Sequence, residues 1–117
     1  SGREGTPSGA RANVLAAWES TIAAHFAAEE RWILPLVPRR EDAERLRAEH
    51  EDLRGIVERL SSANPEAEPE LLRRLAHALE EHIRWEERHL FPAVEAGALP
   101  DELRKAGEQL AGTDRRS

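Results

Sequence analysis

The sequence contains an internal repeat, and this repeat limits the folds that the chain can adopt. Residues 25–37 (HFAAEERWILPLV) and 82–94 (HIRWEERHLFPAV) share His, an apolar residue, two variable positions, Glu-Glu-Arg, one variable position, two apolar residues, Pro, one variable position and Val. Leu15 and Leu72 extend the agreement, because each lies ten residues before the histidine of its copy. Helical periodicity alone does not explain a match of this length. The two copies therefore predict two equivalent structural units.

Apolar residues recur at spacings of three and four residues, as they do on the buried face of an amphipathic helix. We expect helices over about residues 10–37, 41–60, 69–96 and, as a short last helix, 101–110. Pro35 and Pro38 end the first helix, because proline in a helix interior removes a hydrogen bond and clashes with the preceding turn. The short connection that follows makes the first two helices antiparallel neighbours. The pattern predicts an all-α, antiparallel up-down bundle of three long helices and a short C-terminal one.

The composition agrees with a single helical domain. The chain has 117 residues, of which 34% are charged and 4% aromatic, and this length supports one hydrophobic core. We expect a flexible lead-in over residues 1–9, the helical domain over 10–112 and a frayed tail over 113–117. Because the chain has no cysteine, disulfides and thiolate metal sites are excluded, and His, Asp or Glu must hold any metal.

Charge and hydropathy exclude two classes of partner. The formal net charge of -6 argues against nucleic acid, which requires a clustered basic face. No stretch approaches the roughly 18 apolar residues of a membrane span, and no secretory signal pattern opens the chain. We therefore expect a soluble, cytoplasmic protein with no nucleic-acid or membrane partner.

Ionisable side chains occupy positions where the periodicity requires core residues. These side chains are His25, Glu29, His50, His82 and Glu86. In each repeat the His and the first Glu are four residues apart, which places both on one helix face. Glu29 and His50 both lie about 12 to 14 Å from the turn between their helices, and so at one height. Unpaired buried carboxylates cost several kcal/mol, so either these side chains neutralise one another or a metal ion lies between them.

Three further residues near these positions receive other interpretations. His89 lies one turn beyond Glu86, but its repeat counterpart is Trp32, which cannot bind metal. We therefore interpret His89 as a hydrogen-bonding group behind the ligands, or as a core residue. Glu30 and Glu87, the second glutamates of the two copies, are rotated by about 100° and should face solvent or a neighbouring helix.

The motifs HFAAEERWILP, AEHEDLR around His50 and HIRWEERHLFP resemble the hemerythrin-like, or HHE cation-binding, family over about residues 11–110. The resemblance implies a four-helix bundle in which His25, Glu29, His50, His82 and Glu86 are iron ligands. It also implies that Glu29 and Glu86 bridge two irons. The oxygen-carrying members end in a different motif, HxxxxD, which is absent here, so the resemblance does not imply reversible oxygen transport.

The family's first helix supplies a lone histidine, and the residues before His25 contain none. We expect that a helix carrying it lies a few residues before Ser1, or else that a partner subunit covers the open apolar face in a homodimer. The leading hypothesis is a non-haem iron protein, with two ions, that binds or senses O2, NO, peroxide or iron. Mn and Zn are alternative ions. A di-iron oxidase or peroxidase and a metal-free helical interaction domain are the alternative functions, and enzyme activity stays open.

Overall fold

The structure is a computed structural model that describes residues 8–115 and the side chains of residues 9–112. Every regular element in that range is helical, including short π and 3-10 turns labelled η: α1 Ser8–Ala17, η2 Trp18–Ile22, α2 Ala23–Ala28, η3 Glu29–Ile33, η4 Leu34–Leu36, α3 Arg40–Ser61, α4 Glu68–Trp85, η5 Glu86–Leu90, α5 Phe91–Gly97 and α6 Pro100–Arg115. The all-α prediction is confirmed. Most of the lead-in and the end of the tail, residues 1–7 and 116–117, lie outside the described residues.

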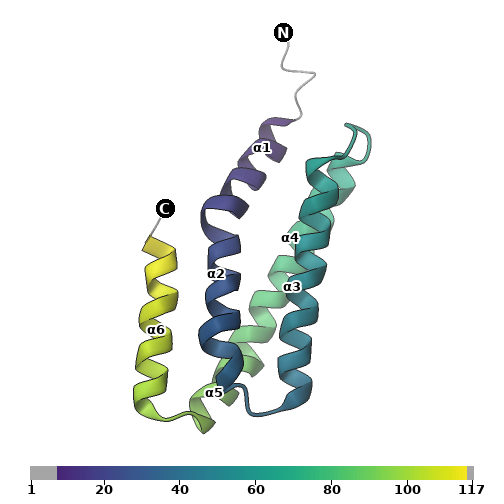
Figure 1. The fold of residues 1–117 in the computed structure, drawn as a ribbon. Coiled ribbons are helices and arrows are strands. Elements are labelled where there is room, and N and C mark those ends of the chain that lie inside the picture. Colours follow the sequence, from purple (N-terminus) through teal and green to yellow (C-terminus); the bar gives the residue numbers. More distant parts are fainter. Residues whose placement is uncertain (1–7, 116–117) are drawn as a thin grey trace.

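The elements form four helical columns that run alternately in opposite directions (Figure 1). The first column joins α1, η2, α2 and η3, the second is α3, the third joins α4, η5 and α5, and the last is α6. None of these helices is long and apolar enough to cross a membrane within the described part of the chain. The described chain is an antiparallel up-down bundle of the predicted kind.

The C-terminal helix differs most from the sequence expectation. It spans Pro100–Arg115, whereas apolar spacing predicted a shorter helix over 101–110. It runs beside α2 (Figure 1), and Ala106, Leu103 and Leu110 pack in one cluster with Ile33 and Val94. In the part of the bundle near α5, α6 therefore fills the fourth position, for which the sequence suggested an upstream helix or a partner subunit. The upstream helix itself stays a prediction.

Two apolar clusters enclose a polar layer. One cluster is made of Phe26, Leu53, Ile56, Val57, Leu60, Leu71 and Leu75. The other is made of Ile33, Leu46, Trp85, Leu90, Val94 and Ala106. Along α3, His50 lies between Leu46 of one cluster and Leu53 of the other. Apolar side chains thus cover the polar layer from both ends of the bundle.

The repeat also appears in the backbone. A π turn begins at Glu29 and another at Glu86, and each is closed by a backbone N–H that donates to the carbonyl of that glutamate. Pro35 and Pro92 follow these turns directly and have no N–H to donate. A widened turn accommodates a proline within a helix, and π turns are frequent at functional sites. The two glutamates therefore occupy equivalent backbone positions.

Candidate metal centre

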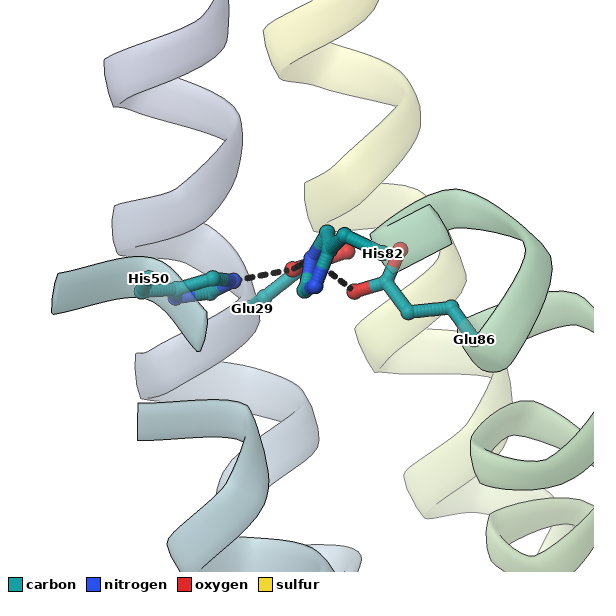
Figure 2. A group of neighbouring side chains, drawn as sticks. All are labelled: Glu29, His50, His82 and Glu86. Atoms are coloured by element: carbon teal, nitrogen blue, oxygen red, sulfur yellow. Dashed lines mark hydrogen bonds and ion pairs between the residues drawn. The ribbon is translucent and has the colours of Figure 1, made fainter. Parts of the chain in front are cut away.

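Four buried side chains meet in the polar layer (Figure 2). Glu29, His50, His82 and Glu86 each offer one ligand atom, and these atoms all lie within 4.8 Å of one another. Glu29 and His50 are 0% exposed, and Glu86, the most exposed of the set, is 4% exposed. Because the four come from the first, second and third columns, the packing of the whole bundle holds them together.

Glu29 lies at the centre of this group. Its Oε1 atom is 2.9 Å from His50 Nε2 and 3.9 Å from His82 Nε2. His82 Nε2 is also 3.0 Å from Glu86 Oε2. Phe26 stacks on the His50 ring at 4.0 Å between centroids and limits its rotation. The expectation that Glu29 and His50 face each other at one height agrees with these distances.

His25 lies beside this buried group. Its Nε2 atom is 3.2 Å from the other oxygen of Glu29, Oε2, and its side chain is 29% exposed. It lines a groove of about 390 Å³ that also reaches His82 and Glu86. The structure therefore brings four of the five sequence-predicted ligands into one buried cluster and places His25 next to it, in the lining of a groove.

Three polar atoms of the cluster are buried without a well-oriented hydrogen-bond partner among the described residues. They are Glu29 Oε2, His82 Nε2 and Glu86 Oε2. Native proteins rarely leave buried polar atoms unpaired, because each costs about 1 to 3 kcal/mol. A cation among these atoms would remove that cost, so the residues present fit a bound metal ion.

The pKa values show how protons occupy this cluster when no cation is bound. Burial, together with the negative charge of Glu29, raises the pKa of Glu86 to about 7 against the opposing effect of His82. Burial alone would lower the pKa of His82, but the nearby carboxylates of Glu29 and Glu86, together with a hydrogen bond to Glu49, raise it to about 10. Burial alone would raise the pKa of Glu29, but the neighbouring imidazoles of His25, His50 and His82 hold it below its usual range. Metal and protons must therefore compete for the same atoms.

The family assignment agrees with this geometry. The model of the Hemerythrin HHE cation binding domain matches the chain twice, over residues 2–94 and over residues 42–112. The chain belongs to this family. No curated protein and no solved structure matches the chain. The two matches overlap over residues 42–94, as expected for a domain whose two halves resemble each other. The family binds cations, and the buried His and Glu cluster is where this HHE domain could hold them.

Two carboxylates of this HHE domain lie behind the histidines. His50 Nδ1 is 2.7 Å from Glu30 Oε2, and His82 Nδ1 is 2.7 Å from Glu49 Oε1. Glu30 therefore faces a neighbouring helix, one of its two predicted environments. Sequence reasoning missed Glu49. The sequence signal for Glu49 is its place directly before His50, with Arg45 four residues before Glu49.

His89 and Glu87 lie farther from the cluster. His89 is half-exposed, and its Nε2 atom is 3.1 Å from both carboxylate oxygens of Asp42. Its ring stacks on Trp85 at 6.2 Å between centroids. The hydrogen bonds that the structure shows for His89 thus go to Asp42, whereas the sequence suggested either a hydrogen bond to a ligand residue or a position in the core. Glu87 is exposed and lines the groove beside His25.

Proposed function

We propose that this HHE domain is a non-haem iron protein that holds two iron ions and binds or senses a small molecule. The ligands would be His25, Glu29, His50, His82 and Glu86. The observation that carries the proposal is the convergence of three buried polar atoms without a well-oriented hydrogen bond, Glu29 Oε2, His82 Nε2 and Glu86 Oε2, in one cluster of four potential ligands. The cost of burying these atoms in an otherwise apolar bundle supports a resident cation.

The donor set supports iron. Imidazole nitrogens and carboxylate oxygens suit Fe and Mn and also accept Zn. A pair of ions is supported by Glu29, whose two oxygens face different histidines, His50 on one side and His25 on the other. Glu86 is its counterpart in the second repeat. We therefore infer that Glu29 and Glu86 would each help to hold both ions.

The groove beside His25 supports a small ligand. Apolar side chains of Ile22, Leu79 and Ile83 line it, and it reaches His25 and Glu86. When bound, iron held by histidines and carboxylates supplies open coordination positions for O2, NO or peroxide. The apolar walls favour small molecules that carry little charge, so we propose O2 or NO as the ligand class.

The test is metal analysis of the domain after anaerobic loading with Fe(II) and removal of excess metal. We expect about two irons per chain, as in carboxylate-bridged helical bundles, and a near-ultraviolet absorption band after exposure to air. His50→Ala and His82→Ala should abolish loading, because each removes a buried ligand. His77→Ala is the matched control, since His77 is exposed.

The same experiments separate the alternative functions. Steady-state consumption of peroxide or O2 by the iron-loaded domain would assign a di-iron oxidase or peroxidase at this site. Metal content near zero in the loaded wild-type protein would instead assign a metal-free helical interaction domain and end the iron proposal.

A further inference from the structure

The α3 helix carries a group of four residues that includes its buried histidine. Arg45 lies four residues before Glu49, His50 follows Glu49 directly, and Arg54 lies four residues after His50. On a helix these spacings place Arg45 one turn from Glu49 and Arg54 one turn from His50. One segment of α3 can therefore contact both neighbouring columns.

Two parallel hydrogen-bonded chains start from this group. In one, Arg54 Nη2 donates to Glu30 Oε2 at 2.9 Å, and His50 Nδ1 donates to the same oxygen at 2.7 Å. In the other, Arg45 Nε donates to Glu49 Oε2 at 2.7 Å, and His82 Nδ1 donates to Glu49 Oε1 at 2.7 Å. Each chain runs from an arginine through a carboxylate to a buried histidine.

We infer that Glu30 and Glu49 are positioning residues for metal binding, an inference that rests on the proposed function. By accepting the Nδ1 hydrogen, each carboxylate leaves Nε2 of its histidine without a proton and directed into the cluster when metal is bound. A carboxylate acceptor also makes the imidazole a stronger donor to metal. Glu30 acts on His50, and Glu49 acts on His82.

The burial of the partners favours this role over a purely structural one. The side chains of Glu30 and Glu49 are 30% and 24% exposed, so water could satisfy both carboxylates even if they made no hydrogen bond to a histidine. The histidine rings are 0% and 1% exposed, so their Nδ1 groups depend on the carboxylates for a partner. The arginines hold the carboxylates in place, and Arg45 also lies over the Trp85 ring, 4.5 Å from its centroid.

The inference is tested by metal affinity, measured by competition with a chelator, using Zn(II) as the probe. Glu30→Ala and Glu49→Ala should each bind Zn(II) about 10- to 100-fold more weakly than the wild type. Glu51→Ala is the matched control, because Glu51 is exposed on the same helix, and it should stay within about twofold. The double variant should bind Zn(II) more weakly than either single variant.

A spectroscopic readout separates positioning from folding. Nitrogen chemical shifts of the Zn(II)-loaded wild type should show Nε2 bound and Nδ1 protonated in both His50 and His82. Glu49→Ala should shift the His82 signals more than those of His50, and Glu30→Ala should do the reverse. If an alanine variant does not fold, the glutamine variant keeps the side-chain shape while removing the charge, and it should bind Zn(II) about tenfold more weakly.

Two results would overturn the inference, and they are distinguishable. Wild-type protein that loads metal, beside glutamate variants that bind within about twofold of it, would reject the positioning role alone. Wild-type protein that loads no metal would reject the proposed function, and the positioning role with it.

Discussion

Glu86 shows at the scale of one residue that the requirements of metal binding and of folding oppose each other. Its carboxylate is buried, and its pKa is raised to about 7 by burial and by the nearby charge of Glu29. Ionising this group therefore costs folding free energy when no cation is bound. The same charge is what a metal ion requires, so we expect the residue to be retained for binding at the expense of stability.

Glu86→Gln tests this opposition. At pH 8 we expect the free energy of unfolding of the metal-free protein to rise by about 1 to 3 kcal/mol, because a buried ionised carboxylate is removed. The gain should shrink as the pH falls toward 5, where Glu86 is protonated in the folded state. Metal affinity should fall at least tenfold. Urea denaturation of chelator-treated protein and metal competition measure the two effects.

Glu87→Gln is the control, since Glu87 is the next residue and exposed. It should change neither the stability nor the affinity by more than about 0.5 kcal/mol. A stability loss in Glu86→Gln at pH 8 would contradict the role assigned to the buried charge.

At the scale of the elements, α3 combines the densest set of functional residues with a glycine in its interior. Gly55 lies within Arg40–Ser61, one residue after Arg54. A Cβ atom added there would have nothing within 4 Å, and no glycine in the described part of the chain has a positive φ. No close contact or turn therefore requires a glycine at this position.

Gly55→Ala should raise the free energy of unfolding by about 0.5 to 1 kcal/mol, because alanine loses less backbone entropy on entering a helix. Metal affinity should stay unchanged, since the substitution adds one methyl group outside the cluster. Thermal unfolding and metal competition on the same samples provide the measurement. Reduced stability would show that this part of α3 cannot accept even a methyl group.

At the scale of the whole molecule, α6 completes the bundle on one side of the site. Ala106 is 2% exposed and lies in the cluster that contains Ile33 and Val94. The helix therefore covers the η3 segment that begins at Glu29. Its docking should stabilise both the fold and the polar layer.

Ala106→Asp should cost about 2 kcal/mol or more of stability, because it buries an unpaired charge in this interface. Amide hydrogen exchange should accelerate in residues 29–33 and 91–97, which lose their covering helix. Lys105→Asp, at the adjacent exposed position, is the control and should leave exchange in both segments unchanged. Equal exchange in the two variants would show that α6 contributes little to the bundle.

The pH dependence of stability should differ in sign between the metal-free and the metal-loaded protein. The pKa of His82 is raised from 6.5 to about 10, so its contribution to stability is complete below pH 6.5 and is lost as the pH rises toward 10. The pKa of Glu86 is raised from 4.5 to about 7, so stability also falls over that window. Metal-free protein should therefore lose stability from about pH 5 to 10.

Metal-loaded protein should gain stability over the lower part of this range, because fewer protons compete with the ion as the pH rises. Urea denaturation of both forms at several pH values measures the two slopes. Parallel slopes would contradict the competition between metal and protons. The homodimer, which the sequence offered as the alternative to an upstream helix, stays a prediction that sedimentation equilibrium tests. Helix α6 already fills part of the face for which that partner was invoked.

The sequence by itself determined the local features of this protein. Helical periodicity placed the helices, and the four-residue spacing of His82 and Glu86 placed both on one face, because the helix repeat depends only on neighbouring residues. The short turn after the first column also set Glu29 level with His50. These results follow from rise per residue and chain connectivity alone.

Only the tertiary structure decided which groups lie behind the ligands and what covers the bundle. Glu30 and Glu49 meet their histidines across helix interfaces, His89 turns to Asp42, and α6 packs beside η3. Such contacts depend on how each helix is rotated about its axis and which column it packs against. A rotation of one residue position, about 100°, moves a side chain from the core to solvent, and apolar spacing does not define helix rotation finely enough to assign these partners.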